Sequence, residues 1–147
     1  MSITYLLIAI VVMAALSPLI SAMPSRRQRL IADLRQAAVV TGLFVRFRQS
    51  PLERDDAPPR VFYGRRRTRE DAKVNGKIIY RCDNGTWTAV KGQWAQHLLD
   101  LLQALPGGVS LACEDLQGVG VFWDEQGQKE DVYSIDSVLK GMLARAD

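Results

Sequence analysis

The sequence predicts an α+β domain that follows a single membrane-spanning helix. Residues 3–23 form an apolar run without a charged side chain. Farther along the chain, short strand-like runs are separated by turn signals, among them Asn-Gly dipeptides at 75–76 and 84–85. Two segments, 93–108 and 131–146, instead repeat apolar residues at helical spacing. Adjacent strands joined by tight turns favour a mostly antiparallel sheet with two helices packed on it.

The apolar run has the length of a membrane span. Ile3–Met23 contains 21 residues, and an α-helix of that length covers about 31 Å, close to the thickness of one hydrocarbon core. A cleaved signal peptide is the competing interpretation, because residues 20–22, Ile-Ser-Ala, resemble a cleavage site. Signal peptides usually have a basic segment before a shorter apolar core, and the first residues here carry no Lys or Arg. We therefore expect an uncleaved anchor over residues 1–23.

Arginines directly after the apolar run predict its orientation. Arg26, Arg27 and Arg29 lie just beyond it, and positive charge beside a span stays in the cytoplasm. We expect a single-pass protein of a bacterial inner membrane, with its N-terminus outside and its C-terminal domain in the cytoplasm. The part of the chain after the anchor would comprise a juxtamembrane amphipathic helix over residues 24–42 and a cytoplasmic α+β domain over residues 43–147.

The juxtamembrane segment combines helix signals with an apolar stripe. Pro24 suits the first position of a helix, and Gly42 suits its end. The apolar residues that share one face are Leu30, Ile31, Leu34 and Ala38. Such a helix either lies on the headgroups with its arginines toward phosphate or packs on the domain that follows.

The remaining elements follow from local patterns. In residues 43–49, apolar side chains alternate with arginines, which predicts a half-buried strand. Three prolines and several charges predict a mobile loop over residues 50–60. Further strands are expected at 60–64, 77–82, 86–92, 109–115 and 118–125, and helices at 93–108 and 131–146. Asp131 or Ser134 is expected to cap the last helix.

Charge is distributed unevenly along the chain. Residues 24–73 carry thirteen Lys/Arg and six Asp/Glu, a net charge of +7, whereas residues 74–147 carry six and ten, a net charge of −4. The basic half therefore adjoins the apolar run, an arrangement that suits a domain beside an anionic membrane surface. A nucleic-acid-binding domain would show the same gradient.

Four arginines within residues 65–69 form the most concentrated basic segment. A loop of this kind neutralises several phosphates of lipid or nucleic acid, and Phe62 and Tyr63 precede it as candidate base-stacking side chains. No recognisable RNA- or DNA-binding signature accompanies it, so anionic headgroups or a protein partner are expected and nucleic acid is unlikely. The residues expected to contact the membrane surface or a partner are Arg26, Arg27, Arg29, Arg65, Arg66, Arg67 and Arg69.

Patterns of catalytic or metal-binding residues are sparse. The chain has one histidine, His97, and two cysteines, Cys82 and Cys113, without the spacing of a metal site. Whether the two cysteines meet is left open by the sequence. Three acidic pairs, which suit either solvated turns or Mg²⁺ binding and acid–base work, lie at 114–115, 124–125 and 130–131. We expect no cofactor, no metal, no small-molecule substrate and no enzymatic activity.

The N-terminal layout resembles that of the YajC family, small proteins associated with the Sec preprotein translocase. Members have one N-terminal span, then a proline with a basic polar run, then a short helix. Residues 17–36, SPLISAMPSRRQRLIADLRQ, follow this order, with a loose match at Pro24, Arg26, Arg27, Gln28 and Arg29. The glycine-rich strand motif that follows in YajC is not visible in this chain. The resemblance implies an accessory role at the inner membrane.

Three functional hypotheses fit these observations. The first is a membrane-anchored, non-enzymatic interaction module that docks other proteins, as part of a larger membrane complex. The second is a membrane-tethered nucleic-acid-binding domain that uses the arginines of residues 65–69. The third is an enzyme built on the carboxylates near residues 114–131.

Overall fold

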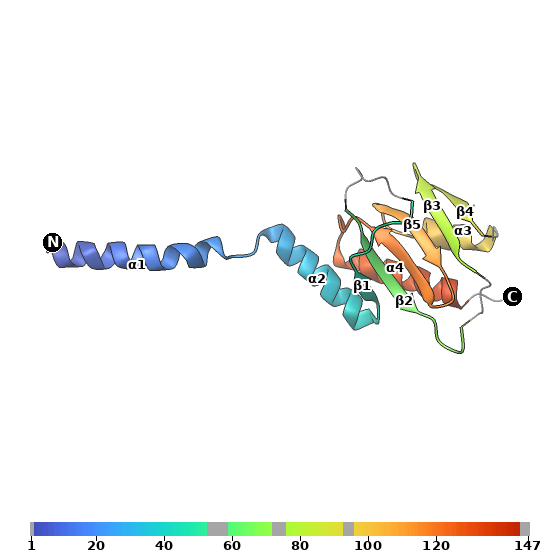
Figure 1. The fold of residues 1–147 in the computed structure, drawn as a ribbon, viewed down its shortest axis with the longest axis horizontal. Helices are drawn as coiled ribbons and strands as arrows, with labels where there is room; N and C mark the ends of the chain where they lie inside the picture. Colours follow the sequence, from blue (N-terminus) through green and yellow to red (C-terminus); the bar gives the residue numbers. More distant parts are fainter. Residues whose placement is uncertain (1, 53–58, 72–75, 93–95, 145–147) are drawn as a thin grey trace. The chain divides into compact units, whose positions relative to one another are not determined.

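The computed structural model describes residues 2–52, 59–71, 76–92 and 96–144. The chain folds as two compact units, Met1–Leu30 and Ile31–Asp147, and the second unit contains both apolar clusters of the fold. Figure 1 shows the helices and strands in their order along the chain.

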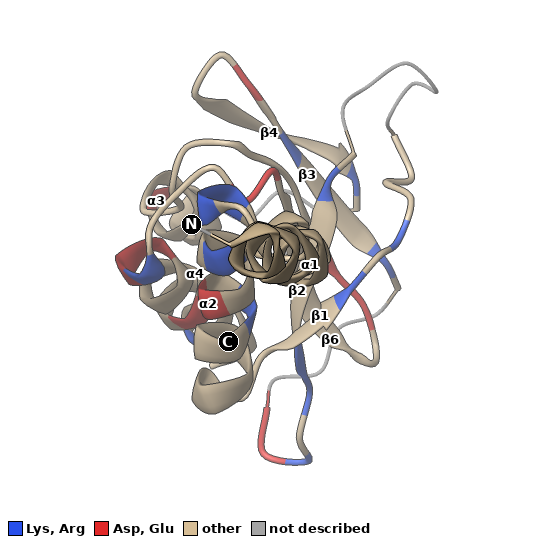
Figure 2. Cartoon of the chain, turned by 90° about the vertical axis from the view of Figure 1, so that its left-hand side faces the viewer, with Lys and Arg blue, Asp and Glu red and all other residues tan. Residues whose placement is uncertain are grey.

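The first unit consists mainly of α1, Ile3–Ser21. This helix is long and apolar enough to cross a membrane, and no other helix within the described residues has that length and composition. Figure 2 shows no charged residue along α1, and Pro18 falls near its end, where a helix tolerates proline. The expected apolar N-terminal helix is confirmed.

The next helix, α2, covers Arg26–Thr41 and is capped by Ser25. The N–H of Gln28 donates to Ser25 Oγ at 3.2 Å, and the N–H of Ser25 donates to Gln28 Oε1 at 2.8 Å. This reciprocal pair is a capping box that satisfies two otherwise free helix donors. Pro24 therefore precedes the cap, and the expectation that it occupies the first helical position is wrong.

The second half of α2 belongs to the folded domain. Leu34, Ala37 and Ala38 are buried in the main apolar core, and Gly42 directly follows the last turn, as expected. Of the two interpretations of this helix, packing on the domain is the one that this burial supports.

The second unit is built around a six-stranded antiparallel sheet in the order β1-β2-β6-β5-β3-β4. The strands are β1 Phe44–Arg46, β2 Val61–Arg66, β3 Ile78–Asp83, β4 Thr86–Lys91, β5 Val109–Glu114 and β6 Gly118–Trp123. Helices α2, α3 (Gln96–Gln103) and α4 (Lys129–Leu143) share the main apolar core with one face of the sheet (Figure 1). The predicted α+β class is confirmed.

One of the two Asn-Gly turn signals forms a hairpin, and the other does not join neighbouring strands. Asn84 and Gly85 join β3 to β4 with φ values of 51° and 80°, as a tight two-residue hairpin turn requires. The other Asn-Gly signal, at 75–76, comes earlier in the chain and begins at Asn75, which lies outside the described residues. The strands on either side of it, β2 and β3, are separated by β6 and β5. The expected succession of neighbouring strands is therefore wrong at this point.

Two element boundaries differ from expectation for identifiable reasons. The first strand ends at Arg46, so Phe47 lies beyond the sheet; it is 77% exposed, and its ring lies 4.7 Å from the Arg35 guanidinium. The last helix begins earlier than predicted, with Gln128 as its N-cap. Asp131 supports this cap from within the first turn, where its carboxylate accepts from the Gln128 N–H at 2.7 Å.

Parts of four predicted segments lie outside the described residues. They are 53–58 of the expected loop, 72–75 with the first residue of the turn signal at 75–76, 93–95 at the start of the helix expected over 93–108, and 145–147 with the end of the helix expected over 131–146.

A second, smaller apolar cluster lies on the opposite face of the sheet. Phe62, Ile79, Leu111, Cys113 and Phe122 form this cluster, with Phe44 packed against it. Cys113 therefore lies on this face, whereas Cys82 packs against the main core on the helix side. Both cysteines are free thiols, and the sheet lies between them.

Candidate functional site

The arginine run 65–67 is divided between the two faces of the sheet. Because β2 continues through Arg66, Arg65 and Arg66 are strand residues and do not belong to a loop. Side chains alternate along a strand, so Arg65 faces the helices and Arg66 faces the opposite side. Arg67 follows the last residue of the strand and forms an ion pair with Glu114.

Arg65 joins β2 to two helices. Its Nη2 atom lies 2.6 Å from Asp136 Oδ1 of α4 and donates at 2.6 Å to the carbonyl of Thr41, the last residue of α2. Lys140 Nζ lies 2.7 Å from the other oxygen of the buried Asp136 carboxylate. This guanidinium is therefore engaged in holding the fold together.

Arg67 is engaged in the same way. Its Nη2 atom lies 2.9 Å from Glu114 Oε1, and the two side chains are 8% and 0% exposed. The same nitrogen also reaches the carbonyl of Asp115 at 3.3 Å. A buried pair of this kind leaves a costly unpaired charge if either partner is removed.

The other expected contact residues are exposed. Arg66 and Arg69 are exposed in the second unit, and Arg26, Arg27 and Arg29 are exposed on the first turns of α2 in the first unit. Of the four arginines in residues 65–69, two are thus available to a partner and two are structural.

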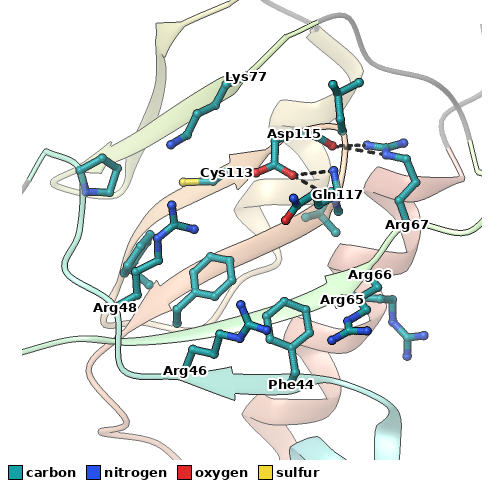
Figure 3. Close-up of a pocket in the computed structure, with 16 residues that line it drawn as sticks. Phe44, Arg46, Arg48, Arg65, Arg66, Arg67, Lys77, Cys113, Asp115 and Gln117 are labelled. Atoms are coloured by element: carbon teal, nitrogen blue, oxygen red, sulfur yellow. Dashed lines mark hydrogen bonds between the residues drawn. The ribbon is translucent and has the colours of Figure 1, made fainter.

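Arg66 borders a groove of about 390 Å³ on the face of the sheet opposite the helices (Figure 3). Phenylalanine rings pack side by side beneath it: the ring centroids of Phe44 and Phe62 are 5.9 Å apart, and those of Phe62 and Phe122 are 5.1 Å apart. Two paired glycines make room for these rings. A Cβ on Gly64 would come within 2.6 Å of Phe44 Cζ, and one on Gly120 would collide with the Phe62 ring.

Two guanidinium groups lie against the same ring at one end of the groove. The Cζ atoms of Arg46 and Arg66 are 5.1 Å and 6.0 Å from the centroid of Phe44. Both distances are within the range of a cation–π interaction. Two neighbouring strands, β1 and β2, therefore each contribute one guanidinium group to the surroundings of this ring.

A second pair of cations lines the groove near Cys113. Figure 3 shows Lys77 and Arg48 on either side of the Cys113 thiol. Burial raises the pKa of this thiol to about 11, although the charges of Lys77 and Arg48 act in the opposite direction. The thiol is consequently protonated at neutral pH and contributes an apolar surface.

The groove carries an excess of positive charge. Asp115 is the one carboxylate among the described residues that line it, and its Oδ1 atom already accepts from the N–H groups of Gln117 and Gly118, at 2.8 Å and 3.1 Å. Within the described part of the chain, no carboxylate pairs with any of four lining cations. These four are Arg46, Arg48, Arg66 and Lys77.

Three of these four cations are absent from the set expected from the sequence. Arg46 and Arg48 lie in or beside the strand predicted over 43–49, and Lys77 immediately precedes β3. The alternation of that first strand was a usable signal, since it places Arg46 on the same face as Phe44. The approach of Lys77 depends on the order of the strands, for which the sequence offers no local signal.

The acidic pairs have structural roles in the described residues. Glu114 pairs with Arg67, Glu125 pairs with Arg35, and Asp131 supports the start of α4. His97 is exposed, and no group of three or more His, Cys, Asp or Glu side chains is placed to hold a metal within the described ranges. Nothing here assembles the carboxylates of residues 114–131 around a common point.

Comparison with known proteins gives no match: no family model, no curated protein and no solved structure is significantly similar to this chain.

Proposed function

We propose that this protein is a membrane-anchored, non-enzymatic interaction module of a bacterial inner membrane. In this proposal α1 crosses the membrane, the second unit works on the cytoplasmic side, and its groove binds an anionic partner. The protein acts as an accessory of a larger membrane complex, in line with the N-terminal resemblance to YajC.

The anchor supports the first part of the proposal. The span-length helix α1 carries no charge, and Arg26, Arg27 and Arg29 follow it directly. Only residues 22–25 separate the end of α1 from α2, a helix whose second half belongs to the second unit. A domain on so short a tether experiences a high local concentration of anionic headgroups and of membrane-bound partners.

One observation carries the second part, namely the four cations of the groove that pair with no carboxylate among the described residues. Three of them, Arg46, Arg48 and Arg66, are exposed, and Lys77 is half-buried. Such a surface attracts anions and discriminates against cationic partners.

Binding to anionic vesicles tests this proposal. The fragment 31–147 retains every residue of both apolar clusters, so it is suited to sedimentation with vesicles. We expect it to bind vesicles that contain anionic lipid at low salt and to be released as salt rises. Arg46→Gln with Arg66→Gln should weaken binding by at least about tenfold, an effect of one charge-assisted hydrogen bond or more.

A matched control separates the groove from net charge. Lys91→Gln with Lys129→Gln removes the same charge from two exposed positions that do not line the groove. This control should change binding by less than about threefold, a free energy below 1 kcal/mol. An equal loss in the two double variants would refute a specific role for the groove.

A nucleic-acid partner remains the alternative, with less support. Single-stranded binders stack bases on accessible aromatic rings, but Phe62 and Phe122 beneath the groove are only 8% and 1% exposed. A mobility-shift assay of the same fragment with single- and double-stranded probes distinguishes the two. Binding of either probe without binding of vesicles would favour the alternative.

A further inference from the structure

We infer that the groove is a phosphoryl-binding site, in which Arg46 and Arg66 hold one phosphate group and Arg48 and Lys77 hold a second. The inference rests on the proposed function, because it names the chemistry of the anion that the groove accepts. It applies most directly to a phosphate monoester of a small molecule, and the experiment below distinguishes this source from the phosphodiester of a lipid headgroup, which carries one charge.

The charge of the first pair favours phosphate over carboxylate. The guanidinium groups of Arg46 and Arg66 lie around the Phe44 ring, at 5.1 Å and 6.0 Å from its centroid. Neither pairs with a carboxylate among the described residues, and a single carboxylate neutralises only one of the two charges. A phosphate group carries a charge of about −1.5 to −2 and three acceptor oxygens, so it neutralises both and accepts from both.

The rigidity of the first pair is also suited to phosphate. Guanidinium groups bind phosphate through a planar fork of donors, and contact with an aromatic ring restricts the movement of that fork. The Phe44 ring packs against the Phe62 ring and occupies space that a side chain at position 64 would fill. Less side-chain entropy is therefore lost when an anion binds.

The second pair extends the site along the groove. Arg48 is two residues beyond Arg46, and Lys77 approaches from the start of β3, with the Cys113 thiol between them (Figure 3). Phe62, Phe122 and the neutral thiol also line the groove, although little of each is exposed. A ligand with two phosphate groups on a compact body, in which each phosphate reaches one pair of cations, matches this arrangement.

The volume is that of a small-molecule site. Ligand pockets usually enclose about 300–1,000 Å³, and this groove of about 390 Å³ lies at the lower end of that range. A sugar bisphosphate or the headgroup of an anionic lipid is of suitable size, whereas a folded partner would contact only the rim.

Calorimetric titration of the full chain in an uncharged detergent tests the inference. The probes are fructose 1,6-bisphosphate, glycerol 3-phosphate, glycerophosphoglycerol as a soluble lipid headgroup, and citrate as a carboxylate of similar charge. We expect the bisphosphate to bind at least about tenfold more tightly than citrate and than the monophosphate. Binding of glycerophosphoglycerol as tight as that of glycerol 3-phosphate, despite its single charge, would support the phosphoryl site and identify a lipid headgroup as its source.

Two sets of variants assign the phosphates to the two pairs. Arg46→Gln with Arg66→Gln should abolish binding of both phosphate esters, whereas Arg48→Gln with Lys77→Gln should reduce the bisphosphate to the affinity of the monophosphate. Arg66→Lys retains the charge without the planar fork and should bind more weakly than the unaltered protein. This variant keeps the test decisive if the double variants fail to fold.

The outcomes separate this inference from the proposed function. If citrate binds as tightly as the bisphosphate, or no phosphate compound binds, the phosphoryl site is refuted. The proposed function then still stands if vesicle binding depends on Arg46 and Arg66. If vesicle binding is also independent of these residues, both are refuted.

Discussion

The Arg35 guanidinium forms a bidentate ion pair with Glu125, at 2.8 Å from Nε to Oε1 and 2.7 Å from Nη2 to Oε2. Arg35 lies in α2 and Glu125 two residues beyond the end of β6, so the pair fastens α2 to the centre of the sheet. Glu125 is 4% exposed and has a φ of 57°, a left-handed backbone conformation that only a few non-glycine residues adopt. The local chain is thus bent where this carboxylate enters the core.

Removal of Arg35 should loosen α2. Arg35→Met leaves the buried Glu125 carboxylate without its cation, and the free energy of unfolding of the fragment 31–147 should fall by about 2 kcal/mol, since the guanidinium itself is partly exposed. Urea denaturation measures this loss. Arg81→Met, which removes the exposed pair with Asp83, should cost less than about 0.5 kcal/mol. Equal losses in the two variants would contradict the role given to Arg35.

Tyr63 should make the stability of the domain fall at alkaline pH. Burial, together with the hydrogen bond that its hydroxyl donates to Glu125 at 2.8 Å, raises the pKa of Tyr63 above the ordinary value of 10.0. Above that value the unfolded chain releases the proton and the folded chain retains it, so unfolding becomes more favourable as pH rises.

Comparison of Tyr63→Phe with the unaltered fragment isolates this effect. The variant should lose about 1 kcal/mol at neutral pH with the hydrogen bond, and its denaturation midpoint should fall less steeply between about pH 9 and 11. Parallel pH profiles for the two proteins would show that Tyr63 does not titrate on unfolding.

The buried pair of Arg67 and Glu114 should be the most costly of the ion pairs to break. Arg67→Met should destabilise the fragment by about 3–5 kcal/mol because it removes the Arg67 guanidinium from its ion pair with the fully buried Glu114 carboxylate. The double variant Arg67→Met with Glu114→Gln should recover part of this loss. Urea denaturation of the unaltered fragment, Arg67→Met and the double variant measures the free energy of unfolding of each. A double variant less stable than Arg67→Met would argue that the buried Glu114 charge is not the cause of the loss.

Gly120 should be sensitive to the addition of a single methyl group. Gly120→Ala places a Cβ against the Phe62 ring, and the resulting displacement should cost about 1–3 kcal/mol and distort the groove. Gly107→Ala is the matched control, since a Cβ there meets nothing within 4 Å. Thermal unfolding compares the two, and a Gly120→Ala protein as stable as the control would show that the ring accommodates the methyl group.

The positions of the helices and strands follow from local sequence patterns, whereas the pairing of one strand with another does not. Alternation and helical spacing locate β3–β6 and α4 to within a few residues, because each pattern reflects which face is buried. The pairing of β2 with β6 joins segments more than fifty residues apart along the chain, and no turn signal connects them. Strand order is a property of the whole sheet, so it was not available from any local segment.

The same distinction explains the candidate site. The sequence shows the density of arginines at 65–69 but not which of them have acidic partners. The partners of Arg65 and Arg67 are Asp136 and Glu114, at distant positions in the chain. Without the sheet order, the groove between β1, β2 and the start of β3 was likewise hidden, and only Arg66 of its four cations without a carboxylate partner in the described structure was anticipated.

Protease access to the full chain tests the central claim, that α1 holds the second unit on the cytoplasmic side. Residues 1–23 contain no Lys or Arg, so trypsin has no site in any segment that this account places outside or within the membrane. Trypsin added to intact spheroplasts should leave the chain at full length, and trypsin added after lysis should degrade it. Trimming of the domain in intact spheroplasts, or a mature chain that begins after Ala22, would contradict the account.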